Sequence, residues 1–489
     1  MTRSSVWIVG GAVLFLAGCA APPAQPSHPS VAPATQPSAS LSMDSGPVKP
    51  MYRELLAIDL PTVVRVAQAR NLDIQQAIER TRAAHGRYES SVEAIFPVIA
   101  PSVAYQHLEG VNQNANGTLT VANFNNFLPA IAIQWMLSPG RVVYDIVASK
   151  RRMEASEHQE ASVVQETTRA AMIQYYDLVL AQAQLGVARQ AVSEAEELLR
   201  ITTSRVQAGA GLPADELRAR AELAARQQDL ALALNAFYQS SVALTLTLHL
   251  DPLVTLVPDA AQTKQITLVR EDLSIDQLLS MALEYRPDLQ GARALLKASD
   301  ADKGAVAWGG LGPQLQAGYS FGGLQTHIPG KTYGLHEQQK AGVGASFALG
   351  LSTFGQLKVA SANQRIAGLD VQRQLDQVRA SVVTAQQTGM TQSALIPIAR
   401  QQMESAQEAL RLAQANLQAG TMLTLDVLEA QAAADAARLS YAQAVVRYNE
   451  AQINLLAALG VVDEQMLSIP NVRSASADAG SANRAPAVR

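Results

Sequence analysis

The chain has 489 residues but few of the residue types on which catalytic and nucleic-acid-binding proteins depend. Its one cysteine, Cys19, excludes a disulfide framework and a cysteine metal site. The formal net charge of -4 argues against a nucleic-acid binder, which usually has a basic face. Aromatic residues make up only 5 %, whereas alanine and glutamine are frequent, so the composition favours closely packed helices over a bulky globular core.

Motifs typical of enzymes are also missing from the sequence. The seven histidines show no metal-ligand spacing on a helix, and there is neither a Gly-rich phosphate loop nor a nucleophile elbow. We therefore predict no catalytic residue, no cofactor and no metal site. His327 and His336 fall in one loop and offer a possible metal pair, but two solvated loop residues are the favoured interpretation.

The N-terminal residues have the proportions of a secretory signal. A basic Arg3 precedes an apolar run over residues 6–16, which is too short to span a membrane permanently. The run ends in Leu-Ala-Gly-Cys, which resembles a bacterial lipobox, so we predict a signal peptide over residues 1–18 and acylation of Cys19. An ordinary signal peptide with a chance cysteine is the alternative.

The lipobox resemblance also implies a location. Residue 20 is alanine rather than the aspartate that typically retains lipoproteins at the inner membrane, so sorting to the outer membrane is expected. Residues 19–54 are rich in Pro, Ser and Ala and predict an extended tether. Residues 466–489 predict a disordered C-terminal tail.

Past the tether, the sequence consists of two similar repeats. "QAGAGLPADELRARA" at 207–221 matches "QAGTMLTLDVLEAQA" at 418–432, with a constant offset of 211 residues. Such self-similarity at a long period indicates an internal duplication rather than a solenoid. The predicted repeats are residues 55–272 and 273–465.

Each repeat contains a region in which apolar residues alternate with small or polar ones. The alternation predicts two β-hairpins, at about 98–138 and about 313–352. Strands with one apolar and one polar face are the signature of an outer-membrane barrel, although soluble hairpins remain the alternative. The predicted lipid-facing residues are Trp135, Tyr105, Tyr319 and Phe347, and the predicted lumen-facing residues are Gln134, Gln316 and Ser346.

A long helix follows each hairpin, at about 141–208 and about 355–419. Apolar or small residues recur at every seventh position in both helices, which predicts coiled-coil packing. Shorter return helices follow at about 212–249 and about 424–460. The duplicated stretch is thus the turn at the tip of a helical hairpin, with Gly209 and Gly420 as the C-terminal caps.

Helix lengths suggest how these elements stack. Each long helix spans about 100 Å, while a return helix covers only about 55 Å of it. A helix of about 35 residues before each hairpin is long enough to cover the remainder. Two short helices therefore pair end to end with one long helix, with strands at one end and the duplicated turn at the other.

Four strands cannot close a barrel by themselves. Lipid tolerates no open sheet edge, because unpaired backbone groups cost several kcal/mol each there. The chain is therefore expected to oligomerise. Two copies give eight strands, whose interior is filled by side chains, whereas three give twelve strands with room for a lumen.

Taken together, these features resemble the TolC-like outer membrane efflux protein family over roughly residues 55–465. The resemblance rests on the paired repeats, the strand hairpins, the "QAGxxLxxDxL" tips and the repeat openings that contain Asp73 and Asp288. It implies a homotrimer with a 12-stranded outer-membrane barrel and a periplasmic helical tunnel. It further implies a passive exit duct for an inner-membrane transporter, joined through a periplasmic adaptor protein. A mixed belt around the tunnel is expected from residues 250–272 and from those after 461.

The resemblance also assigns residues at the tips. Acidic residues that match Asp426 and Glu429 ring the periplasmic entrance in the family, and Asp215 is the equivalent in the first repeat. Arg218 replaces the second acid there. The alternative is that Asp426 merely favours the first turn of the return helix. Tip turns and adaptor docking are assigned to Gly209, Gly211, Leu212, Gly420, Thr421 and Leu423.

Two positions depart from the family pattern, and one other function class stays open. Leu417 and Met422 stand where some members have a tyrosine and an arginine that tie the closed entrance, so side chains of those two types are not available at these positions. A purely structural lipoprotein, acting as a coiled-coil spacer, would explain the heptads and the lipobox. It would leave the alternating strands and the duplication unexplained.

Overall fold

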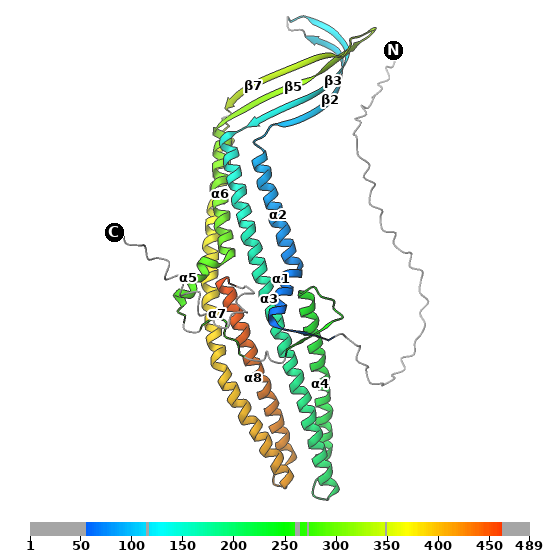
Figure 1. Cartoon of the computed structure of the whole chain (residues 1–489), viewed down its shortest axis with the longest axis vertical. Coiled ribbons are helices and arrows are strands. Elements are labelled where there is room, and N and C mark those ends of the chain that lie inside the picture. Colours follow the sequence, from blue (N-terminus) through cyan, green and yellow to red (C-terminus); the bar gives the residue numbers. More distant parts are fainter. Residues whose placement is uncertain (1–54, 114–116, 260–264, 271–272, 348–349, 462–489) are drawn as a thin grey trace, which may run out of the picture. The chain divides into compact units, whose positions relative to one another are not determined.

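The computed structural model describes residues 55–113, 117–259, 265–270, 273–347 and 350–461 (Figure 1). These residues all belong to one unit of the chain. The predicted signal peptide, Cys19, the tether, the belt residues after 461 and the C-terminal tail lie outside the described residues.

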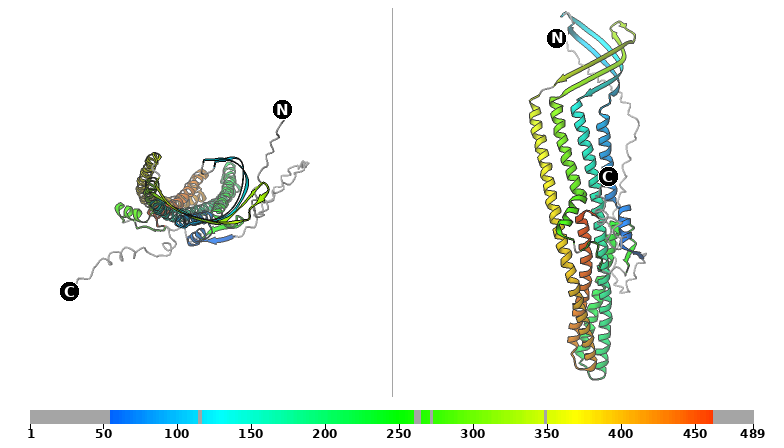
Figure 2. Two further views of the ribbon diagram at one scale, coloured as in Figure 1. Left: turned by 90° about the horizontal axis from the view of Figure 1, so that it is seen from above. Right: turned by 60° about the vertical axis from the view of Figure 1, so that its left-hand side comes forward.

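Two β-hairpins join side by side into one antiparallel sheet. The first hairpin consists of β2 (Val98–Gln113) and β3 (Leu119–Leu137), and the second of β5 (Pro313–Ile328) and β7 (His336–Phe347). Their order is β2-β3-β5-β7, so β3 and β5 connect the two repeats. A short β6 (Lys331–Thr332), which the sequence does not predict, pairs with the end of β5. The sheet is strongly curved (Figure 2).

Helices make up most of the described residues, as the fold class predicts. The long helices are α3 (Pro139–Gln207) and α7 (Ser352–Ala419), and the return helices are α4 (Pro213–Thr247) and α8 (Thr424–Leu459). Both α2 (Leu72–Glu93) and α4 pack on α3, while α6 (Pro287–Leu311) and α8 pack on α7. Because α3 also packs against α6 and α8, it connects the two repeats (Figure 2).

The helix before each hairpin is not continuous, contrary to expectation. In the first repeat it divides into α1 (Leu60–Arg70) and α2, and in the second into α5 (Ile275–Tyr285) and α6. The breaks fall at Asn71 and Arg286, whose ψ angles of 130° and 116° are extended. Asn71 caps α2, since its side chain accepts a hydrogen bond from the Asp73 amide. Arg286 precedes a proline, which disfavours helical geometry at that residue.

A small belt of strand and loop surrounds the middle of the long helices. β1 (Leu55–Ile58) pairs in parallel with β4 (Thr255–Pro258), a pairing that the sequence does not predict. Nearby, Asn449 and Gln452 of α8 accept hydrogen bonds from the amides of Ile266 and Val269, both at 2.9 Å. The largest buried cluster of apolar side chains lies at this level. Its largest fully buried members are Tyr175, Tyr176, Met172, Leu178 and Leu244.

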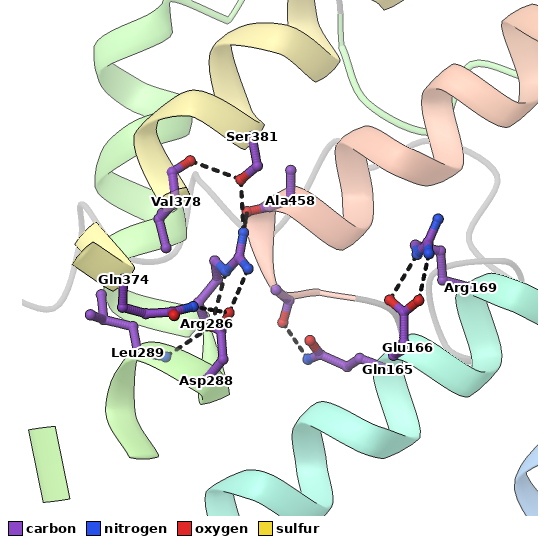
Figure 3. A network of polar contacts seen from close by, with 11 residues as sticks. Gln165, Glu166, Arg169, Arg286, Asp288, Leu289, Gln374, Val378, Ser381 and Ala458 are labelled. Carbon is purple, nitrogen blue, oxygen red and sulfur yellow. Dashed lines mark hydrogen bonds and ion pairs between the residues drawn. The ribbon is translucent and has the colours of Figure 1, made fainter. Parts of the chain in front are cut away.

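A polar network at the same level fixes the α5–α6 corner to its neighbours (Figure 3). The Arg286 guanidinium binds Asp288 through two nitrogens and donates to Ser381 Oγ of α7 at 2.8 Å and to the Ala458 carbonyl of α8. Gln374 of α7 donates to the same carboxylate at 2.6 Å. Burial alone would raise the pKa of Asp288, but the hydrogen bonds and charge of Arg286 outweigh burial and lower it.

Candidate functional site

The two duplicated turns have the same backbone geometry. Gly209 and Gly420 have φ angles of 72° and 80°, a left-handed conformation that glycine adopts without steric cost. After Gly209, the Ala210 amide donates to the Arg205 carbonyl at 2.9 Å; after Gly420, the Thr421 amide donates to the Asn416 carbonyl at 3.0 Å. Both turns are therefore Schellman-type helix ends, and the duplicated motif is retained because each hairpin needs this turn.

The other predicted tip residues frame these turns. A Cβ atom at Gly211 would lie 3.1 Å from Cβ of Arg205, so this position favours glycine for close packing. The Thr421 hydroxyl donates to the Asn416 carbonyl at 3.1 Å. Leu212 and Leu423, which precede the return helices, are 66 % and 70 % exposed. Each tip thus presents an exposed leucine directly before its return helix.

A contact that sequence reasoning missed ties the two tips together. Arg205 of α3 donates to the Leu417 carbonyl at the end of α7 and, at 3.4 Å, to Ala210 in its own turn. The side chain of Leu417 is buried in a cluster with Val427 and Leu410. The only signal in the sequence is an arginine one turn before Gly209. A groove of about 310 Å³, lined by residues of both turns, lies beside this contact.

The predicted gate carboxylates differ between the two tips. Asp426 and Glu429 are exposed on the first turns of α8, and neither forms an ion pair within the described residues. Asp426 accepts a hydrogen bond from the Leu423 amide at 3.2 Å, so it does support the start of α8. Asp215, in contrast, pairs with Arg218 at 3.3 Å. Negative charge is therefore compensated at the first tip and uncompensated at the second.

A further carboxyl group lies higher on the same helix. Glu450 follows Glu429 by 21 residues (450 − 429), or three heptads, so both occupy the same heptad position of α8. The pKa of Glu450 is raised to about 7, chiefly by burial and in addition by the negative charge of Asp177, while Arg447 opposes the rise. Sequence reasoning missed this group, because its burial depends on packing against α3.

Strand pairing separates the sheet into two chemically different faces. Residues that pair across a ladder point to the same side, so the register assigns every strand residue to a face. One set of predicted residues shares one face, here called the apolar face: Tyr105, Trp135, Tyr319 and Phe347. The second set shares the opposite face, here called the polar face: Gln134, Gln316 and Ser346.

Both edges of this sheet are open in the single chain. Among the described strands, β2 pairs only with β3, and β7 pairs only with β5. At the loop end, His327 Nδ1 lies 2.6 Å from Thr332 Oγ1, while His336 opposes Leu324. The described part of the chain contains no group of three or more histidine or carboxylate side chains suited to a metal ion.

Comparison with known proteins places this architecture in a family. The model of the outer membrane efflux protein family matches residues 63–248 and 278–461, so the chain belongs to this family. The two matched segments fall in the two repeats. Nodulation protein T of Rhizobium leguminosarum bv. trifolii is 25 % identical over 420 residues, which cover 82 % of this chain and 85 % of that protein.

Solved structures share the fold. The CmeC outer membrane channel of Campylobacter jejuni matches with a TM-score of 0.72 and 19 % identity, covering 84 % of this chain and 88 % of that one. The outer-membrane channel OprN matches with a TM-score of 0.68 and 21 % identity, covering 82 % and 90 %. The family and these neighbours are outer-membrane channels rather than enzymes.

Proposed function

We propose that the protein is a homotrimeric outer-membrane channel, the passive exit duct of a tripartite efflux or type I secretion system. Its helical tips would dock a periplasmic adaptor protein and, through it, an inner-membrane transporter. The observation that carries this proposal is the curved sheet, which has one apolar face, one polar face and two open edges.

Three copies would satisfy both open edges. In a ring, β7 of one copy pairs with β2 of the next, a head-to-tail contact that closes on itself. Twelve strands then enclose a lumen. The apolar face meets lipid and the polar face lines the lumen, because charged or amide side chains in the hydrocarbon layer are costly.

Exposed apolar side chains along the helices support the same contact. On α7, five of them lie at intervals of about one or two heptads, and on α4 three of them are separated by fifteen and fourteen residues (217 to 232 to 246). Two such stripes on opposite edges of one chain suit a coiled-coil contact between neighbouring copies. The α7 stripe is Leu369, Val383, Met390, Ile398 and Leu412, and the α4 stripe is Leu217, Leu232 and Leu246.

At the far end, the tips would form the gated entrance. Three copies of Asp426 and Glu429 around a narrow axis would concentrate negative potential and favour cations. The exposed Leu212 and Leu423 offer an apolar surface for the adaptor. Lipid on Cys19 would add an anchor in the outer membrane; replacing Cys19 with alanine should abolish acylation, and retained acylation would contradict this anchor.

Planar-bilayer recording on the purified full-length protein tests the channel. A trimer by chemical crosslinking, together with ion conductance, is the expected result. A periplasmic spacer would give no conductance, and that outcome would overturn the proposal.

Single cysteines test the two faces. A membrane-impermeant thiol reagent in the lumen should label positions 134 and 346 but not positions 135 and 347. Because a one-residue slip in register exchanges the faces, the reverse pattern would contradict the assignment.

A further inference from the structure

A groove of about 660 Å³, here called the sheet groove, crosses the apolar face from β2 through β3 and β5 to the start of β7. Pro101 pairs with Ile131, and Ile131 pairs with Phe321, so these side chains lie on one side of the sheet. Ile131 is four residues (135 − 131) from Trp135 on β3 and therefore shares its face. The apolar side chains that line the sheet groove are Pro101, Val103, Pro129, Ile131, Phe321 and Leu335.

The sheet groove lies where the ladder between β3 and β5 is interrupted. Phe127 pairs with Gln325 and Ala130 pairs with Gly322, but the residues between these pairs do not pair. Pro129 lies in the gap and has no N–H to donate. A Cβ atom at Gly322 would lie 2.4 Å from the Pro129 carbonyl oxygen, so β5 needs glycine there. The sequence thus encodes the interruption with two residue types that strand interiors usually avoid.

The apolar walls of the sheet groove are open to the surroundings of the chain. A Cβ atom at Gly323 would lie 2.5 Å from Cδ1 of Leu335, so glycine allows this leucine to close on β5. Leu335 is nevertheless 58 % exposed, and Val103, on the β2 side, is 71 % exposed. No other part of the described chain therefore covers these walls.

A carboxylate lies at the β7 end of the sheet groove. Glu337 lines the groove and accepts a hydrogen bond from the side chain of Gln339. The Tyr319 hydroxyl donates to the side-chain oxygen of Gln339 at 3.3 Å. Within the described residues, Glu337 forms no ion pair. An apolar groove thus ends beside an uncompensated negative charge.

The two ends of the sheet groove lie at different distances from the helices. β7 begins at His336 and runs back toward α7, so Glu337 lies at the end of the sheet that is remote from the helices (Figure 1). β2 begins at Val98 shortly after α2, so Pro101 lies near the helices. In an outer-membrane barrel with periplasmic helices, the groove would run from the outer interface into the hydrocarbon layer, with its carboxylate at the interface.

This placement favours a lipid as the occupant. Lipid tails are as apolar as the groove walls, so the hydrophobic effect does not draw a tail to the protein. An unfilled hollow would lose dispersion contacts along its lining, however, so a tail that fills it is retained longer than one on a flat part of the face. The volume is within the range of about 300–1,000 Å³ typical of small-molecule sites. The charge of Glu337 complements a head group that carries an ammonium.

We propose that the sheet groove binds one acyl chain of a membrane lipid with an ethanolamine head group, and that Glu337 contacts the ammonium of that head group. The groove supplies most of the retention, because an exposed ion pair contributes little; Glu337 supplies the preference for the head group. One lipid binds per chain. This site rests on the proposed channel function, because that function assigns the apolar face to lipid.

Photocrosslinking in vesicles tests the site. The full-length protein is reconstituted in equal amounts of phosphatidylethanolamine and phosphatidylglycerol, with a trace of phosphatidylethanolamine that carries a diazirine in one acyl chain. Peptide mass spectrometry then locates the adducts. Residues of the sheet groove should carry about fivefold more adducts than Ile99 and Ile133, which lie on the same face outside it. Adducts spread evenly over the apolar face would overturn the site but agree with the proposed function; adducts mainly on the polar face would contradict the proposed function itself.

Matched variants separate the acyl chain from the head group. Val103→Trp fills the sheet groove and should lower its adducts about fivefold, whereas Ile99→Trp adds the same side chain to β2 outside the groove and should change them less than about twofold. Glu337→Gln should lower the ratio of phosphatidylethanolamine to phosphatidylglycerol adducts about threefold, measured with a second diazirine probe on phosphatidylglycerol. Equal effects of the two tryptophans in folded trimers would overturn acyl-chain binding. An unchanged ratio in Glu337→Gln would overturn the head-group contact.

Discussion

The two repeats share a backbone plan but differ in their polar side chains. Both have a broken helix, a strand hairpin, a long helix, a glycine turn and a return helix. At the helix break, Asn71 caps α2 and donates one bond to the Thr247 carbonyl of α4, whereas Arg286 binds Asp288 and contacts both α7 and α8. Residues that define the backbone, such as Gly209 and Gly420, are thus retained in both copies, while polar side chains have taken on different tasks.

The two repeats also differ in how many neighbouring helices their long helix contacts. α3 packs against α2, α4, α6 and α8, whereas α7 packs mainly against α5, α6 and α8. The long helix of the first repeat is therefore internal to the chain, and that of the second repeat leaves an exposed apolar stripe. The second repeat accordingly contains the polar network around Arg286, the uncompensated charge at its tip and the proposed contact with a neighbouring copy.

Replacing Arg286, at the helix break of the second repeat, with the residue type found at the break of the first repeat should have the largest effect on stability. Arg286→Asn removes the ion pair with Asp288 and the bonds to Ser381 and Ala458. A half-buried carboxylate would lose its cation, so the free energy of unfolding should fall by about 3 kcal/mol. Urea unfolding followed by circular dichroism measures it.

The matched change in the first repeat is Asn71→Ala. It removes a helix cap and one bond to the Thr247 carbonyl, and should cost only about 1 kcal/mol. Equal losses in the two variants would show that the corners are energetically equivalent, contrary to the comparison.

A second difference between the repeats concerns one position of the return helices. Glu450 in α8 corresponds to Gln239 in α4 at the offset of 211 residues. The pKa of Glu450 is raised from 4.5 to about 7, chiefly by burial, so the folded protein binds more protons between these values. The free energy of unfolding therefore falls as pH rises from about 4.5 to 7.

Glu450→Gln should remove this pH dependence and raise the free energy of unfolding at pH 8 by about 2 kcal/mol. Urea unfolding at pH 5 and pH 8 measures both effects. The control, Gln239→Glu, places a carboxyl at an exposed position and should change stability by less than about 0.5 kcal/mol. A pH dependence that persists in Glu450→Gln would assign it to another group.

Features with a local signal could be predicted from the sequence. The alternation around Tyr105, Trp135 and Tyr319 gave the strand faces, and Gly209 and Gly420 gave the turns. The helix breaks were missed, although a proline at 287 is a local signal.

Other features have no local signal. β1 and β4 are four-residue strands separated by about two hundred residues of sequence. The contact of Arg205 with Leu417 and the burial of Glu450 arise only when helices from both repeats pack together.

The last comparison is between the carboxylates at the two tips, where the expected changes in free energy are the smallest. Asp426→Asn combined with Glu429→Gln removes the uncompensated charge, so block by a trivalent cation from the periplasmic side should weaken about tenfold, or about 1.4 kcal/mol. Asparagine at position 426 keeps a side-chain oxygen that can accept the bond from the Leu423 amide, so this change separates charge from capping. Asp215→Asn should change block by less than about twofold, because Arg218 already compensates Asp215.

The converse substitution gives the first tip the pattern of the second. Arg218→Glu frees Asp215 and places a second acid where the second repeat has Glu429, so block should strengthen about threefold. Single-channel current in planar bilayers, with the blocker titrated on one side, measures all of these variants. If block is unchanged in the Asp426 and Glu429 double variant while the trimer stays folded, the carboxylates do not ring the conducting path. If Asp215→Asn weakens block as much as the double variant, the first tip contributes equally, and its ion pair with Arg218 opens in the assembled channel.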